Sequence, residues 1–218
     1  MGETEEVTFP SGRIKLEGVL HLPDGRARNG LAAVVCHPHP LFGGSMDNLV
    51  VVKMCEALAE AGVRALRFNF RGVGASGGDH SGGEEEASDV VSAMRFLKGR
   101  NGKVSVGLAG YSFGAGMALL AALGDIGVKK VACVALPARL LKVKVDLSKV
   151  KGLSVLLIGG SNDTVAPLDD MKAVEAGSKG KARLEVIQGT DHFFGGKTQV
   201  VGKLVAEFLV GTRNAQKR

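Results

Sequence analysis

The chain has 218 residues and a net charge of +6, with 45% hydrophobic and 23% charged residues, which is typical of a globular protein. This length fits one large domain better than two small ones. The three cysteines show no paired spacing, which argues against a disulfide framework or a zinc site, and the scattered basic residues form no continuous stripe for a nucleic acid. The acidic first residues lack the apolar core of a signal peptide, and no apolar run is long enough to span a bilayer, so we expect a cytoplasmic protein.

Two short strands, at residues 7–9 and 13–22, come first and are joined by a predicted turn at residues 10–12. After them, apolar runs typical of buried strands alternate with helical periodicities. Further strands are predicted at residues 31–36, 63–70, 103–109, 131–136, 153–158 and 183–187, and helices at 47–61, 88–98, 113–123, 168–176 and 198–210. This alternation predicts a mostly parallel sheet with helices on both faces. We expect a single domain over residues 1–218, with a frayed tail at 211–218.

The sequence Gly110-Tyr111-Ser112-Phe113-Gly114 stands between a predicted strand and an almost wholly apolar helix. It matches the G-x-S-x-G pattern in the strand–turn–helix context, in which a sharp turn projects the serine hydroxyl above the sheet. The helix that begins here also directs free N–H groups toward developing negative charge. We therefore predict Ser112 as a nucleophile, in preference to the simpler interpretation of a serine in a glycine-rich helix cap.

A serine hydroxyl needs a neighbouring base. In the chain order that accompanies such a serine the base comes last, and His192 is the one histidine of five that follows the last predicted strand. We predict His192 as the base, in preference to a capping or core histidine.

The acid that orients this base is predicted after the strand at residues 153–158, where Asp163 lies in a short loop. Asp191 is a rival by proximity, but adjacent residues seldom point toward each other. Asp169 and Asp170 fall in the first turn of the next helix, where acids commonly interact with the helix dipole.

The loop at residues 37–46 follows the first long buried strand and is the expected source of a second N–H donor for a tetrahedral oxyanion, beside the N–H of Phe113. Its two prolines have no N–H, which leaves His39 or Leu41 as the donor. Two histidines alone, at positions 37 and 39, are too few for a metal site. The residues predicted to contact substrate are Phe42, Gly43, Tyr111 and Phe193.

The sequence Arg71-Gly72-Val73-Gly74-Ala75-Ser76-Gly77 contains the string G-x-G-x-x-G of dinucleotide-binding proteins. That motif should lie at the first strand–helix turn and open its helix at once, whereas here the glycines continue before any helix is predicted. We interpret the segment as a flexible loop at the rim of the site and predict no cofactor.

Together these motifs, GYSFGAG, HPHPLFGG, FNFRGVGASGG, GGSNDTVAP and GTDHFF, resemble small α/β-hydrolases related to the dienelactone-hydrolase-like and prolyl-oligopeptidase-like branches, over residues 7–210. The resemblance implies an eight-stranded, mostly parallel sheet in a three-layer sandwich and the triad of Ser112, Asp163 and His192. Dienelactone hydrolases themselves use a cysteine where this chain has Ser112, so their substrate does not carry over.

The stretch between the strands ending at Leu136 and beginning at Leu153 has no room for the helical cap of many relatives. We therefore expect a shallow, open site that hydrolyses short-chain or small polar carboxylic esters through an acyl-serine. A peptidase or amidase with the same triad is one alternative, and a non-catalytic binding scaffold is another. The expected partner is a small-molecule ester rather than a nucleic acid or a membrane, and a homodimer through a sheet edge or the closing helix is compatible with the sequence.

Overall fold

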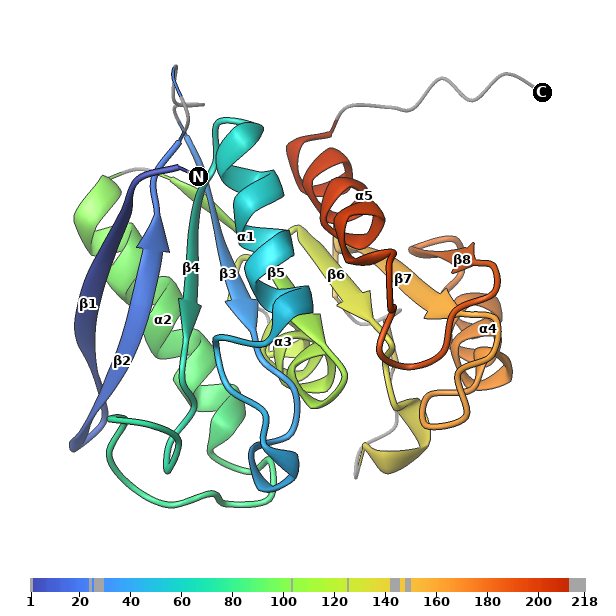
Figure 1. The fold of residues 1–218 in the computed structure, drawn as a ribbon, viewed down its shortest axis with the longest axis horizontal. Helices are drawn as coiled ribbons and strands as arrows, with labels where there is room; N and C mark the ends of the chain where they lie inside the picture. The colour runs from blue at the N-terminus through green and yellow to red at the C-terminus, as the bar shows by residue number, and fades with distance from the viewer. Residues whose placement is uncertain are drawn as a thin grey trace.

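The computed structural model describes residues 2–23, 25, 30–102, 104–124, 126–141, 146–147 and 150–211. These residues form one eight-stranded sheet with the order β1-β2-β4-β3-β5-β6-β7-β8, shown in Figure 1. Both pairings of β2 are antiparallel, and the pairings from β4 through to β8 are parallel. The strands are β1 (Thr4–Ser11), β2 (Ile14–His21), β3 (Leu31–Cys36), β4 (Arg64–Phe68), β5 (Ser105–Tyr111), β6 (Lys130–Val134), β7 (Ser154–Gly160) and β8 (Ala182–Ile187).

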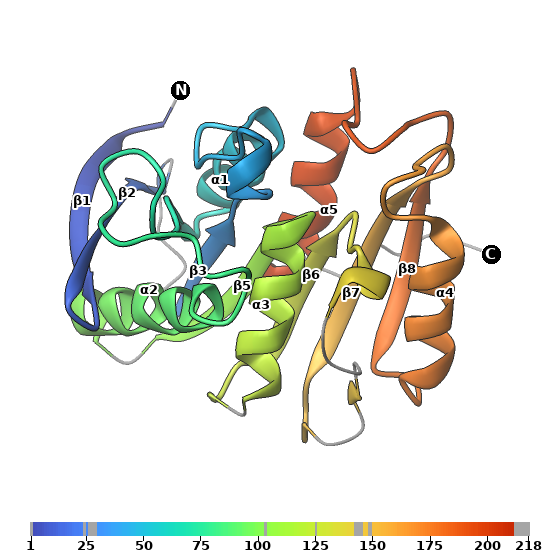
Figure 2. The same ribbon diagram turned by 90° about the horizontal axis from the view of Figure 1, so that it is seen from below.

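Helices cover both faces of the sheet, which confirms the predicted three-layer α/β architecture. Helices α1 and α5 pack together on one face, and α2, α3 and α4 lie on the other, as the view from below in Figure 2 shows. The α-helices are α1 (Leu49–Glu60), α2 (Glu86–Asn101), α3 (Phe113–Leu123), α4 (Leu168–Gly177) and α5 (Thr198–Val210), and two 3-10 turns are η1 (Pro40–Phe42) and η2 (Ala138–Leu140).

The core consists of two apolar layers, one on each face of the sheet. Strand β3 shows how the sequence builds both, because consecutive side chains of a strand point to opposite faces. Val34 joins the layer under α2 and α3, whereas the next residue, Val35, joins the layer under α1 and α5. Both side chains are fully buried, which explains why the parallel strands are continuous apolar runs.

The hairpin of β1 and β2 differs from its prediction. Pro10 lies within β1 and pairs with Lys15, so the connecting turn contains only Gly12 and Arg13. Strand β1 is at the edge of the sheet, where a proline is tolerated because its missing N–H can face solvent. The predicted frayed tail lies, from residue 212 onward, outside the described residues.

The carboxyl ends of the parallel strands meet at one edge of the sheet, which is the lower edge in Figure 1, where η1 and η2 lie. In folds of this kind the ligand site lies beyond that edge. In the described part of the chain no helix is long and apolar enough to cross a membrane.

Candidate active site

Ser112 occupies the sharp turn between β5 and α3. Its backbone has φ 54° and ψ −118°, a conformation that costs a non-glycine residue about 1–3 kcal/mol. The turn is held by a hydrogen bond of 2.8 Å from the Ser112 N–H to the Val134 carbonyl oxygen. The flanking glycines are required by close approach, because a Cβ at Gly110 would lie 2.2 Å from the Gly114 carbonyl oxygen, and a Cβ at Gly114 would lie 2.4 Å from the Cys36 carbonyl oxygen.

The structure brings together the three residues that the sequence predicts as nucleophile, base and acid. The Oγ atom of Ser112 lies 3.1 Å from Nε2 of His192, and Nδ1 of His192 lies 2.8 Å from Oδ2 of Asp163. All three side chains are buried. A continuous hydrogen-bonded chain therefore runs from the carboxylate through the imidazole to the hydroxyl.

The environment of Asp163 keeps its carboxyl group ionised. Its second oxygen, Oδ1, accepts hydrogen bonds from the N–H groups of Val165 and Ala166 at 2.9 and 2.8 Å. Burial alone would raise the pKa of Asp163, but the hydrogen bonds from His192 and from these two N–H groups outweigh burial and lower the pKa. Because a carboxylate only accepts, Nδ1 of His192 carries the proton and Nε2 is left to accept the proton of the Ser112 hydroxyl.

The loop that carries His192 is fixed by contacts on two sides. The N–H of Asn162, at the end of β7, donates to the Thr190 carbonyl oxygen at 2.9 Å, and a Cβ at Gly160 would lie 2.5 Å from that same oxygen. On the other side, the hydroxyl of Tyr111 donates to the His192 carbonyl oxygen at 3.0 Å. Tyr111 is predicted from the sequence as a substrate contact, whereas the structure buries it to 2% exposure against this loop.

The two candidates for the second oxyanion donor, His39 and Leu41, differ in whether their backbone N–H already has an acceptor. The N–H of Leu41 donates to Nδ1 of His39 at 3.2 Å, an interaction that caps η1. The N–H of His39 has no acceptor among the described residues. The close approach of Gly114 to the carbonyl of His37 places this loop beside the beginning of α3, where the N–H of Phe113 has no intrahelical acceptor.

His37 has a structural place in this loop. Its Nδ1 lies 2.6 Å from the Pro38 carbonyl oxygen, and its Nε2 accepts the N–H of Phe70 at 3.0 Å. Burial lowers the pKa of His37 to about 4, so the ring is neutral and links the loop to the segment after β4. Within the described ranges, no group of three or more His, Cys, Asp and Glu side chains could hold a metal ion.

An apolar pocket of about 470 Å³ opens beside Ser112. The predicted substrate contact Phe42 lines it, together with His39 and Phe113. Gly43 and Phe193 are not part of its lining, although Phe193 is 69% exposed next to His192. The pocket walls also contain Met117 and Leu120 of α3, which the sequence analysis did not identify; their spacing of four and seven residues from Phe113, on one helix face, was the available signal.

The glycine-rich loop at residues 71–85 packs on β2 through its first part, and its later residues 82–84 line the pocket, as expected of a loop at the rim of the site. The Oε1 atom of Glu17 accepts hydrogen bonds from the Ala75 N–H and from Nδ2 of Asn69, both at 2.7 Å. A Cβ at Gly74 would lie 2.1 Å from that same oxygen. Gly74 is thus accounted for by the tight packing of this loop against Glu17 of β2.

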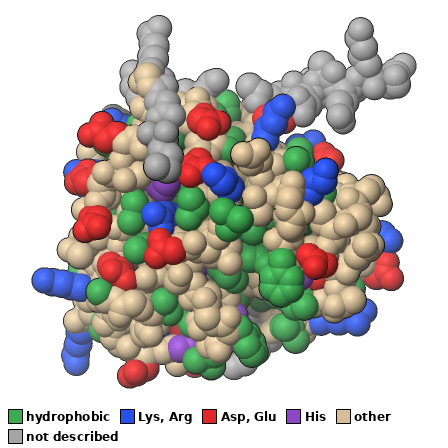
Figure 3. Space-filling view, in the orientation of Figure 1, with side chains coloured by type: hydrophobic (Ala, Val, Ile, Leu, Met, Phe, Trp, Pro, Cys, Tyr) green, Lys and Arg blue, Asp and Glu red, His purple; other side chains and the backbone are tan. Residues whose placement is uncertain are grey.

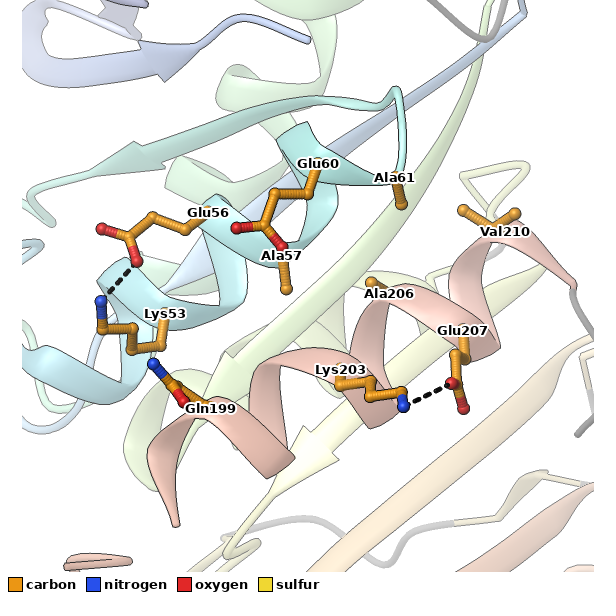
Figure 4. Close-up of a pocket in the computed structure, with 10 residues that line it drawn as sticks. All are labelled: Lys53, Glu56, Ala57, Glu60, Ala61, Gln199, Lys203, Ala206, Glu207 and Val210. Atoms are coloured by element: carbon orange, nitrogen blue, oxygen red, sulfur yellow. Dashed lines mark hydrogen bonds and ion pairs between the residues drawn. The ribbon is translucent and has the colours of Figure 1, made fainter. Parts of the chain in front are cut away.

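A second cleft, of about 550 Å³, lies between α1 and α5 and is drawn in Figure 4. Charged side chains edge it, including the ion pairs of Lys53 with Glu56 and of Lys203 with Glu207. Its lining contains no serine, cysteine, threonine or histidine. The cleft therefore lacks the hydroxyl, thiol and imidazole groups that serine and cysteine hydrolases use, whereas the pocket beside Ser112 contains a serine.

Comparisons with known proteins identify similar chains and structures, although no protein-family model matches the chain. An uncharacterized protein of Rickettsia prowazekii (strain Madrid E) is 32% identical over 209 residues, which cover 92% of this chain and 86% of the relative. An α/β serine hydrolase homologue from Coxiella burnetii is 31% identical with a TM-score of 0.84, over 95% of this chain and 97% of that one. A serine hydrolase without a lid from Xanthomonas campestris is 27% identical with a TM-score of 0.86, over 99% and 97% of the two chains. The chain therefore belongs to the α/β-hydrolase superfamily, as a hydrolase without a lid.

Proposed function

We propose that this hydrolase cleaves carboxylic esters of small molecules through an acyl intermediate on Ser112. The observation that carries the proposal is the hydrogen-bonded chain from Asp163 through His192 to the Ser112 hydroxyl, at a strained turn that opens onto a pocket. The chemistry needs only these side chains, two N–H donors and water, so we propose no cofactor.

In the first half of the reaction, Nε2 of His192 takes the hydroxyl proton as Oγ of Ser112 attacks the ester carbonyl carbon. The carbonyl oxygen becomes an oxyanion that accepts hydrogen bonds from the N–H groups of Phe113 and His39. When the bond to the leaving alkoxide breaks, His192 returns its proton to that oxygen. Asp163 keeps the imidazole in the required tautomer and stabilises its protonated form.

In the second half, water attacks the acyl-serine while His192 removes a proton from it. The tetrahedral oxyanion forms again in the same position and collapses with cleavage of the bond to Ser112 Oγ, which takes the proton back. The carboxylic acid leaves and the enzyme is restored.

The test is hydrolysis of p-nitrophenyl acetate by the wild type and by Ser112→Ala. We expect kcat to fall by at least about 10³-fold in the variant, because removal of a triad nucleophile has effects of that order or larger. Ser154→Ala is the matched control, since Ser154 is an exposed residue at the beginning of β7, the opposite end of that strand from Asp163. Equal activity of Ser112→Ala and wild type would contradict the proposal.

A fluorophosphonate probe and a p-nitroanilide series complete the test. The probe should label Ser112 in the folded protein and should not label it after boiling. A non-catalytic scaffold would not be labelled in either state.

Esters should be cleaved faster than anilides of the same acyl group, because an amide leaving group depends more strongly on protonation by His192. Faster cleavage of the anilides would identify an amidase instead.

A further inference from the structure

The pocket beside Ser112 is lined mainly by apolar side chains, and the proposed ester hydrolysis alone does not account for them. Helix α3 presents Phe113, Met117 and Leu120 to it, and the segment at η2 presents Leu140 and Leu141 from another side. Met117 is 3% exposed, whereas Leu140 is 74% exposed, so the pocket runs from a buried wall to an open mouth. The hydrophobic side chains continue onto the surface, where they gather in the lower half of the face in Figure 3, over the end of the sheet that carries η1 and η2.

The exposed hydrophobic residues of the described chain are concentrated at this mouth. Leu140, Phe42 and Val165 all line the pocket and are 74%, 87% and 51% exposed. Leu41, which neighbours Phe42 in η1, is 72% exposed. Large apolar side chains that cluster in this way mark a surface that binds an apolar partner, whereas isolated ones need no explanation.

A third wall of the pocket is formed by residues 82–84 and is built as a rigid part. A Cβ at Gly83 would lie 3.4 Å from Cε of Met117, so this loop already approaches the apolar wall to contact distance. The fully buried carboxylate of Glu86 holds the loop from behind, because it accepts hydrogen bonds from the Ser81 N–H, the Ser81 hydroxyl and the Gly83 N–H at 2.7, 2.6 and 2.8 Å. The pocket is therefore shaped before a substrate arrives, which lowers the cost of binding.

The geometry also indicates which half of an ester enters the pocket. The residues proposed to hold the oxyanion, Phe113 and His39, both line it, so the carbonyl group lies against this pocket. His192 must deliver a proton to the leaving oxygen, and His192 does not line the pocket. The leaving group thus lies on the histidine side, and the acyl chain extends into the pocket.

We infer that the site takes esters whose acyl group is an unbranched apolar chain of medium length, longer than butyryl and shorter than the long chains of membrane lipids. This inference rests on the proposed ester hydrolysis, and it replaces the short-chain or polar preference expected from the missing cap with a preference for longer apolar acyl groups. The lining supplies apolar contact along the chain but no enclosed tunnel for a longer one.

The experiment compares p-nitrophenyl acetate, butyrate, hexanoate, octanoate, decanoate and palmitate, which share one leaving group. We expect kcat/KM to rise by about fourfold per methylene while each added methylene is buried, then to level or fall beyond decanoate. A second series of alkyl acetates, from methyl to octyl, should show little dependence on chain length, since that half of the ester lies outside the pocket.

Variants of the pocket lining test whether the dependence of kcat/KM on acyl-chain length comes from the pocket. Leu120→Trp should lower the ratio of octanoate to acetate kcat/KM by at least tenfold, because the larger side chain fills the space. Leu49→Trp is the matched control, since Leu49 is an exposed leucine at the beginning of α1 and lies outside the lining; its profile should equal that of wild type. If Leu120→Trp does not fold, Leu140→Ser takes its place. Leu140 is exposed, so this change does not disturb the core, and it should lower the same ratio of kcat/KM values.

The possible results distinguish a failure of the acyl-chain preference from a failure of the proposed ester hydrolysis. A flat or falling acyl series, a steeper alkyl series or a preference for aromatic over octanoyl esters would overturn the inference while Ser112-dependent acetate hydrolysis stands. Failure of every ester together with failure of the fluorophosphonate label would overturn both.

Discussion

At the scale of single residues, the ionised carboxyl group of Asp163 makes the stability of the folded protein depend on pH. The pKa of this carboxyl group is lowered in the folded protein, since the hydrogen bonds from His192 and the backbone outweigh burial. The stability that it contributes is therefore fully present above the pKa of a free aspartate, about 3.9, and is lost as the pH falls through the lower pKa of the folded state. We expect the wild type to lose stability more steeply than Asp163→Asn on acidification below about pH 4.

Urea unfolding of both proteins over a pH series measures this difference. The stability gap between wild type and Asp163→Asn should be constant near neutral pH and should narrow in acid. A gap that widens on acidification would show that the Asp163 carboxyl group is stabilised in its protonated form instead.

Tyr111 has one role predicted from the sequence, a substrate contact, and another in the structure, a hydrogen bond to the loop that carries His192. Tyr111→Phe removes the donor to the buried His192 carbonyl oxygen, which should cost about 1–3 kcal/mol of stability. Because the base is then less well positioned, kcat should fall by up to about 10²-fold with KM nearly unchanged. A rise in KM at constant kcat would instead support the substrate contact predicted from the sequence.

The sequence could indicate the three residues of the proposed triad because each of them follows a strand at a defined place in chain order. It could not indicate the partner of Tyr111, because this hydroxyl finds its acceptor only once the distant His192 loop lies against β5. The hydrogen bond of the Leu41 N–H to His39 is local, yet it depends on the η1 turn, which periodicity does not show.

At the scale of elements, the contact between α3 and the end of β3 depends on Gly114. A Cβ there would lie 2.4 Å from the backbone oxygens of Cys36 and His37, and neither can move without displacing β3 or the loop that follows. Gly114→Ala should therefore destabilise the protein by about 1–3 kcal/mol or more and lower its activity. Gly99→Ala is the matched control, because Gly99 lies in α2 with nothing within 4 Å of its Cβ position, and alanine should stabilise that helix by up to about 1 kcal/mol.

Urea midpoints of the two variants test this prediction, since both make the same substitution in a helix. Equal midpoints would show that the β3–α3 approach is not constrained as the structure indicates.

Element boundaries were predictable where periodicity was strong and failed where polar partners decided them. Helix α3 and strand β3 have the predicted bounds, since their apolar runs are uninterrupted. Helix α2 begins two residues before its predicted beginning, at Glu86, whose buried carboxylate binds the preceding loop. Buried acids of this kind resemble ordinary first-turn acids in a sequence, because their partners lie in segments that periodicity does not connect.

At the scale of the whole molecule, the order of strands and helices predicted the fold class because parallel strands are joined by crossover connections, which are usually helices. The connection from β6 to β7 is the exception, since its described residues contain only the 3-10 turn η2. Strands β3 to β8 contribute side chains to both core layers, whereas β1 and β2 contribute only to the layer under α2 and α3. We therefore expect both faces of the sheet to unfold in one transition, although the chain is longer than most two-state domains.

The three cysteines are built-in probes of this cooperativity. Cys36 and Cys133 belong to the layer under α2 and α3, and Cys55 belongs to the layer under α1 and α5. All three are fully buried, and burial raises the pKa of each thiol, so none should react with a thiol reagent in the native state. Labelling in urea, resolved by mass spectrometry, should give one midpoint for the three thiols, because the shared strands cannot expose one layer without releasing the other. Reaction of Cys55 at a lower urea concentration than Cys36 would mean that α1 and α5 detach while the sheet and its opposite layer persist.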